Sequence, residues 1–291
     1  MLRRTNTLKL LKTIEGSYRP RQEEIFELAE LARMNKLYLA YLRAIGDVLR
    51  DELLREKARF RWFMGNVTEV VEALNGLSYA LYKFRKPVDH VSVDLDILSD
   101  RRDVPRAVRL LRDRGFRVIS PEPYTVTLAR RGFIVDLYTQ PSFAWVVYLD
   151  GKKLLRDYVE GIEVNGVPAR GLTREAEVVV AAAHAICKEH IVLLIDCLLA
   201  WSWMNENVWS IATELGAERA LKELLRVCSL VKSGGAEAPY RLELHTVAKM
   251  FLDKVLHDPA FRVTVTNVLK YVFLMQGSGK RILWRMTSRS Y

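Results

Sequence analysis

Hydrophobic residues recur at helical spacing towards both ends of the chain. In residues 21–60, apolar side chains stand three or four positions apart with Arg and Glu between them, which predicts one or two amphipathic helices. Residues 65–74 predict another helix, because Asn75-Gly76 is a strong turn signal directly after them. Beyond Thr173, a predicted N-cap, the pattern is helical again, with a linker at Ser233-Gly234-Gly235. The helices expected there span 176–187, 191–203, 208–215, 217–231, 241–256 and 264–275.

The middle of the chain has the shorter apolar runs that are typical of strands. Asp103 is expected to cap a helix that Gly115 ends. The predicted fold class is therefore α+β, with a small mixed sheet flanked by N-terminal helices and a C-terminal helical domain. Strands are predicted at 77–83, 91–98, 116–119, 124–129 and 133–138, with a hairpin at 162–167. The expected domains are 1–62 (helical segment), 63–170 (α+β core) and 171–291 (helical domain with a basic tail).

Two aspartates share one face of the strand predicted at 91–98. Side chains two positions apart on a strand point the same way, so Asp94 and Asp96 project together. The intervening Val93, Leu95 and Ile97 are expected in the core. Adjacent negative charges on an apolar strand are unfavourable unless a cation or hydrogen bonds compensate them. Mg²⁺ or Mn²⁺ fits such oxygen ligands and retains positions for phosphate.

A third aspartate, Asp136, interrupts the hydrophobic strand predicted at 133–138. If this strand lies beside the one that carries Asp94 and Asp96, three carboxylates converge. Such a cluster suits two-metal phosphoryl or nucleotidyl transfer, in which metal ions activate the attacking oxygen and bind the triphosphate. The alternative interpretation is a set of ordinary solvent-facing acids.

This arrangement resembles the DNA polymerase β-like nucleotidyltransferase superfamily, and within it the minimal, uncharacterised nucleotidyltransferases similar to abortive-infection toxins. The resemblance rests on a strand that ends in a loop, an Asp-x-Asp strand at Asp94 and Asp96, and a third acid at Asp136 on a later strand. The segment 181–190 and the Asp-containing helix after it resemble the helical region that follows the core in those proteins. The similarity covers residues 74–203.

The resemblance implies that Asp94 and Asp96 bind the metal ions and that Asp136 completes the catalytic carboxylates. Members usually have Gly-Gly or Gly-Ser at the end of the first strand, where the backbone and hydroxyl hold the triphosphate. This chain has Lys83-Phe84 instead. Lys83 and Arg85 are expected to bind phosphate by charge. The same departure favours the alternative of a non-catalytic nucleotide or RNA binder.

Several charged residues of the helical region are further candidates. His184 and Lys188 are four positions apart and share a helix face, from which they can contact phosphate; the alternative is a half-buried histidine beside a surface lysine. Asp196 is expected to cap a helix or to pair within the helical domain, with His190 as a candidate partner. The segment 277–280 has only a superficial likeness to a P-loop, because the first Gly, the Ser/Thr and the preceding strand are missing.

The amino-acid composition indicates which kinds of partner and which cellular compartment to expect. The 45 Lys and Arg exceed the 35 Asp and Glu by ten, which favours an anionic partner, nucleotide first and nucleic acid second. Three cysteines with no close pair predict neither a disulfide framework nor a zinc site, and hence a reducing, cytoplasmic compartment. No apolar run is long enough to predict a membrane span or a signal peptide. Scarce glutamine is a feature of thermophile proteins.

The leading hypothesis is Mg²⁺- or Mn²⁺-dependent transfer of NMP from an NTP to an acceptor hydroxyl on RNA, tRNA, a protein or a small molecule. A non-catalytic nucleic-acid or ribonucleoprotein binder on the same fold is the first alternative, motivated by Lys83-Phe84 and the basic tail. A metal-dependent glycosyltransferase is the second, since those enzymes also use Asp-x-Asp, but it would leave Asp136 without a role. No membrane partner is expected.

Overall fold

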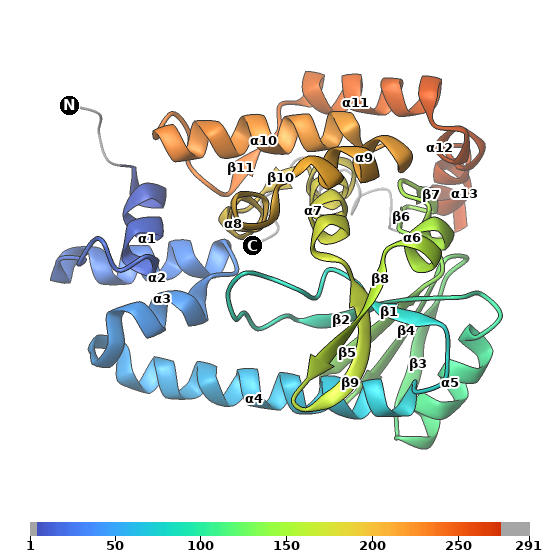
Figure 1. Cartoon of the computed structure of the whole chain (residues 1–291), viewed down its shortest axis with the longest axis horizontal. Helices are drawn as coiled ribbons and strands as arrows, with labels where there is room; N and C mark the ends of the chain where they lie inside the picture. The colour runs from blue at the N-terminus through green and yellow to red at the C-terminus, as the bar shows by residue number, and fades with distance from the viewer. Residues whose placement is uncertain (1–4, 275–291) are drawn as a thin grey trace.

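A mixed sheet organises the protein, which is described by a computed structural model over residues 5–274. Its strands are β1 (Tyr79–Leu81), β2 (Asp94–Ser99), β3 (Arg117–Pro121), β4 (Thr125–Arg130), β5 (Phe133–Tyr138), β8 (Val159–Val164) and β9 (Val167–Leu172). Their spatial order is β3-β4-β5-β2-β1-β9-β8 (Figure 1). β2 runs parallel to β5 and β1 parallel to β9, whereas the other neighbouring pairs are antiparallel. The predicted α+β class is confirmed.

Helices precede, interrupt and follow this sheet. They are α1 (Asn6–Ile14), η1 (Gln22–Glu24), α2 (Ile25–Met34), α3 (Tyr38–Ile45), η2 (Gly46–Leu49), α4 (Arg50–Ala73), α5 (Val104–Asp113), α6 (Gly151–Asp157), α7 (Arg174–Ala183), the π-helix η3 (His184–Glu189), α8 (Leu194–Trp203), α9 (Glu206–Glu214), α10 (Glu218–Ser233), α11 (Leu244–His257), α12 (Pro259–Thr264) and α13 (Asn267–Leu274). Two short ladders pair β6 (Ser142–Phe143) with β7 (Val146–Val147), and β10 (Ile191–Val192) with β11 (Tyr240–Arg241).

The predicted strands and hairpin form, with shifted ends. Asn165 and Gly166 join β8 to β9 with φ angles of 50° and 79°, the left-handed pair that a tight hairpin turn requires. Val93 was expected in the core, but it is 76% exposed, and β2 begins only after it, at Asp94. Asp103 precedes α5 as expected, but its carboxylate accepts the backbone N–H of Ser78 instead of capping the helix.

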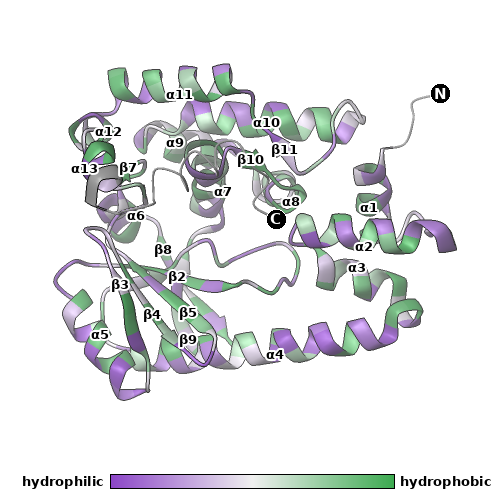
Figure 2. Ribbon diagram, turned by 180° about the vertical axis from the view of Figure 1, so that it is seen from behind, coloured by the Kyte–Doolittle hydropathy of each residue, from purple (hydrophilic) through white to green (hydrophobic). Residues whose placement is uncertain are grey.

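The helix α4 is longer than the pattern predicted. It runs unbroken through residues 60–65, where a gap between two helices was expected. Its second half stays helical because Phe63, Val67 and Val70 are buried against the sheet, and this packing outweighs the weak helix propensity of Gly65. The expected domain boundary at 62/63 thus falls inside α4. Figure 2 shows hydrophilic and hydrophobic residues interspersed along this helix.

The two faces of the sheet pack against different helices. Leu95 and Ile97 of β2 belong to the core under α4 and α5. Tyr82 and Tyr138 belong to the opposite core, which includes residues of α6 and α7. Because alternate strand residues point to opposite faces, Asp94, Asp96 and Asp136 share the face that carries Tyr138. The carboxylates therefore lie between the sheet and the C-terminal helices.

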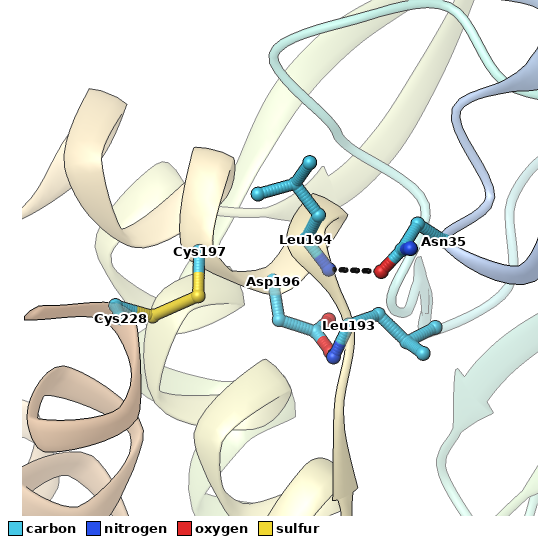
Figure 3. The surroundings of a disulfide bond; sticks show 6 residues. All are labelled: Asn35, Leu193, Leu194, Asp196, Cys197 and Cys228. Atoms are coloured by element: carbon cyan, nitrogen blue, oxygen red, sulfur yellow. Dashed lines mark hydrogen bonds between the residues drawn. A yellow bond between two sulfur atoms is a disulfide. The ribbon is translucent and has the colours of Figure 1, made fainter. Parts of the chain in front are cut away.

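A buried asparagine joins the N-terminal helices to the C-terminal ones. Asn35, at the end of α2, is fully buried. Its Oδ1 accepts the backbone N–H of Leu194 at 2.7 Å, at the start of α8 (Figure 3). Its Nδ2 donates to the carbonyls of Leu31 and Ala238, both at 2.9 Å. One amide side chain thus connects three segments that are distant in the sequence.

The cysteine expectation was wrong. Cys197 of α8 and Cys228 of α10 form a disulfide, with their Cα atoms 5.2 Å apart (Figure 3). The pair was hidden because 31 positions separate the two residues and only the packing of α8 on α10 brings them together. Cys187 is a free, buried thiol.

The C-terminal half follows the predicted helical pattern with local changes. Thr173 caps α7 as expected, accepting the N–H of Ala176. The helix predicted at 264–275 corresponds to α13, which begins three positions later, and the short helix α12 before it was not predicted. The P-loop-like segment 277–280 and the basic tail lie outside the described residues. Within residues 5–274, no helix combines the length and the apolar character that a bilayer crossing demands.

Candidate functional site

Parallel pairing of β2 with β5 gathers the three predicted aspartates. In this register Asp96 lies directly opposite Asp136, and Asp94 lies opposite Ile134. One carboxylate oxygen from each of Asp94, Asp96 and Asp136 lies within 4.8 Å of the other two. The predicted convergence is confirmed, and it follows from strand order: β2 and β5 are neighbours although α5, β3 and β4 separate them in the chain.

The carboxylates are poorly solvated. Asp96 is 7% exposed, and its Oδ1 has no hydrogen-bond partner among the described residues. Burial raises the pKa of Asp136 to about 6; the hydrogen bond from Thr127 Oγ1, at 2.5 Å, opposes this rise, and the charges of Asp96 and Asp94 add to it. Ser92 Oγ donates to Asp94 Oδ1 at 3.2 Å. Three clustered acids with an unsatisfied oxygen are unfavourable without compensating positive charge.

The donor set fits a hard divalent cation. All three groups offer carboxylate oxygens, the ligand type that Mg²⁺ and Mn²⁺ prefer. The unpartnered Oδ1 of Asp96 is a buried acceptor that a metal ion would satisfy. Asp94, Asp96 and Asp136 are thus the residues that would hold a metal.

Lys83 lies against this cluster. Its Nζ forms an ion pair with Asp96 Oδ2 at 2.7 Å, and its side chain is 15% exposed. Burial disfavours the ammonium form, but the negative charge of Asp96 and of neighbouring groups including Asp94 outweighs this and raises the pKa of Lys83 above its ordinary value. Lys83 is therefore a fixed positive charge at the site.

A chain of polar side chains leads from Tyr82 to His184. Tyr82 Oη and Tyr148 Oη are 3.2 Å apart, and Tyr148 Oη lies 3.4 Å from His184 Nδ1. Burial raises the pKa of Tyr148, although Lys83 opposes the shift. Burial, followed by the charge of Lys83, lowers the pKa of His184 well below its ordinary value. His184 is consequently a neutral imidazole at pH 7.

The other predicted phosphate ligands are placed differently. The charge of Lys188 lowers the pKa of Asp136, so this side chain acts electrostatically on the cluster. The Arg85 guanidinium pairs with Glu160 of β8 and donates to the carbonyl of Leu172 at 3.1 Å. Arg85 is thus held at the β8–β9 edge in this structure.

Asp196 caps a helix, and the expected contact with His190 is absent from the described interactions. Its Oδ2 accepts the N–H of Leu193 at the start of α8 (Figure 3). His190 Nδ1 instead lies 2.9 Å from the carbonyl oxygen of Ile186, and its ring lies 6.0 Å from that of Phe251.

Sequence reasoning missed several residues around the site. Tyr138 carried a signal, because it follows Asp136 by two positions and so shares its face. Thr127 and Tyr148 carried none, since their contacts arise from strand pairing and from the fold of the segment after β5. Glu177 is a buried acid of α7, and it accepts the N–H groups of Phe84 and Arg85. In the sequence it is only one acid within an apolar helix, so nothing marked it as a contact of this loop.

Similarity to known proteins was found both in structure and in sequence. The chain resembles a solved structure of the antibiotic-resistance factor ANT(2'')-Ia, with 12% identity and a TM-score of 0.33, over 59% of this chain and 90% of that one. No match was found among curated proteins. A family model described as uncharacterised nucleotidyltransferase matches residues 69–231, which include β1, the three aspartates, the helices through α9 and most of α10. The chain belongs to this nucleotidyltransferase family.

Proposed function

We propose that the protein transfers NMP from an NTP to an acceptor hydroxyl, with Mg²⁺ or Mn²⁺ at Asp94, Asp96 and Asp136. The observation that carries this proposal is the opposition of Asp96 and Asp136 across parallel strands, with Asp94 beside them and all three within 4.8 Å. Family membership supports the reaction class.

Each carboxylate has a distinct environment that suggests its role. A bound divalent ion would lower the pKa of the acceptor hydroxyl and neutralise charge on the phosphates. Asp94 and Asp96, on one face of β2, would hold it. Asp136 is the acid whose pKa is raised to about 6, so near neutral pH it is poised to ligate the ion and to help activate the acceptor.

Positive and hydrogen-bonding groups beside the cluster would bind the triphosphate. Lys83 contacts Asp96 directly, and Lys188 lies within electrostatic range of Asp136. His184 offers a neutral imidazole next to Tyr148. Arg85 would contribute only after its guanidinium leaves Glu160 and binds a phosphate group. This exchange is chemically reasonable, because a guanidinium group binds carboxylate and phosphate oxygens with the same two-pronged geometry.

The experiment is label transfer from α-³²P-labelled NTPs to total RNA, to tRNA and to protein acceptors in the presence of Mg²⁺. We expect transfer by the wild type and a loss of about 100-fold or more in Asp94→Asn, because a ligand to the metal is removed. Asp100→Asn, just past the other end of β2, is the matched control and should keep wild-type activity. Equal transfer by Asp94→Asn and the wild type would contradict the site assignment.

The Lys83–Asp96 ion pair favours a second candidate function, because a lysine that neutralises a carboxylate is also what a non-catalytic binder would contain. In that case RNA would bind in a salt-sensitive way, unaffected by Asp94→Asn, and no NTP would be consumed. The same preparations, assayed for RNA binding at two salt concentrations, distinguish the two functions.

A further inference from the structure

The ammonium group of Lys83 occupies a position inside the carboxylate cluster. It lies 2.7 Å from Asp96 Oδ2. The aromatic rings of Tyr82 and Tyr138 flank it, with their centroids 5.3 and 5.8 Å from Nζ. A cation held by a carboxylate and two ring faces has little freedom to swing away. The Lys83 ammonium group is therefore a fixed part of the carboxylate cluster.

The backbone of Lys83 indicates that this placement is specific. Its φ angle is 57°, in the left-handed region that glycine adopts freely and that is unfavourable for a residue with a Cβ atom. Such conformations persist where surrounding contacts over-determine them. Here the ion pair with Asp96 holds the side chain, and Glu177 accepts the backbone N–H groups of Phe84 and Arg85 that follow.

The two oxygens of Asp96 are divided between different partners. Oδ2 is taken by Lys83, whereas Oδ1 is buried with no hydrogen-bond partner in residues 5–274. The ammonium and one divalent ion would supply three positive charges for the three carboxylates, and Lys188 adds a further positive charge within electrostatic range of Asp136. A second divalent ion would add two positive charges to a poorly solvated site, next to a cation that the ion pair and the two aromatic rings hold in place.

We propose that the Lys83 ammonium takes the place of one of the two metal ions of a two-metal nucleotidyltransferase centre, so that Asp94, Asp96 and Asp136 bind a single divalent ion. This inference rests on the proposed function, because it takes the three aspartates to be the metal site. The ammonium then supplies the fixed positive charge that a second ion would provide to phosphate oxygens.

The experiment counts bound Mn²⁺ in the nucleotide-free protein by electron paramagnetic resonance of free and bound Mn²⁺. The wild type is compared with Lys83→Gly, which removes the cation and relieves the unfavourable φ, and with Lys83→Met, which keeps the side-chain bulk. Lys36 provides the matched control, because it has the same φ of 57° at the end of α2. Lys36→Gly makes the same change of residue type and charge on another element.

We expect one Mn²⁺ per chain in the wild type and in Lys36→Gly, and two in both Lys83 variants. The second ion should bind these variants at least about tenfold more tightly than the wild type, because a neighbouring positive charge is gone. Two ions in the wild type, or one ion in the Lys83 variants, would overturn the inference and leave the proposed function standing. Mn²⁺ binding that Asp94→Asn does not weaken would overturn both, since the ion would then lie elsewhere.

Discussion

The carboxylate of Glu177 accepts the backbone N–H of Phe84 at 3.0 Å, and the same oxygen accepts the N–H of Arg85 at 3.3 Å. The other oxygen, Oε2, is buried without a hydrogen-bond partner in the described part of the chain. Burial raises the pKa of Glu177 to about 7, while Lys86 and the two N–H donors oppose the rise. A helix of the C-terminal half thus occupies the backbone donors of the loop that follows Lys83.

Glu177 should make stability depend on pH. Its pKa in the folded protein, about 7, lies above the ordinary value of 4.5, so unfolded chains release this proton first as pH rises. Its contribution to stability is therefore greatest below pH 4.5 and declines between pH 4.5 and 7. Glu177→Gln removes this decline, so the variant should gain on the order of 3 kcal/mol relative to the wild type between pH 4.5 and 8.

Urea unfolding at several pH values measures this difference. Glu175→Gln is the matched control, because Glu175 lies on the same helix and accepts from the exposed Asn205 side chain. The control should follow the wild type at every pH. A stability difference between Glu177→Gln and the wild type that stays constant from pH 4.5 to 8 would contradict the prediction.

Thr127→Val should raise the pKa of Asp136 further. The Thr127 hydroxyl donates to Asp136 Oδ1 at 2.5 Å and favours the ionised carboxylate, and valine retains the shape without the donor. We expect the Asp136 pKa to rise by about one unit above its value near 6, as measured by carboxyl ¹³C NMR on the metal-free protein. Thr125→Val, two positions away on β4, is the control. An unchanged pKa in Thr127→Val would show that the hydroxyl has no such effect.

The disulfide between Cys197 and Cys228 should stabilise the helical half of the protein. It closes a loop across a sequence separation of 31, so its reduction should lower the free energy of unfolding by about 2–4 kcal/mol. Thermal unfolding with and without dithiothreitol measures the effect. Cys187→Ala should retain the full response to the reductant and Cys228→Ser should lose it. A response that persists in Cys228→Ser would exclude the disulfide as its source.

Asn35→Ala should destabilise the fold strongly. The substitution leaves the buried N–H of Leu194 and the carbonyl of Ala238 without this partner, at a cost of about 3 kcal/mol. Asn207→Ala is the control, because Asn207 is exposed on α9, and it should cost less than about 1 kcal/mol. Chemical denaturation measures both values. Equal losses in the two variants would argue against a joining role for Asn35.

Much of the site was predictable because its signals are local. Alternation along a strand places Asp94 and Asp96 on one face whatever the rest of the chain does. Asp136 is recognisable for the same reason, as an acid within an apolar strand. Turn signals located the β8–β9 hairpin. The break expected before Gly65 was wrong, because burial of one helix face against the sheet overrides the local propensity of a glycine.

Only the tertiary structure decided which contacts form between segments that are far apart in the chain. Whether Asp136 meets Asp96 depends on strand order, which periodicity does not encode. The burial of Glu177 under the Phe84 loop and the pairing of the cysteines likewise depend on how helices pack. The sequence by itself determined which residues carry the chemistry and which face of a strand they share. The fold determined their partners, because hydrogen bonds and ion pairs require ångström proximity that only packing of the whole chain creates.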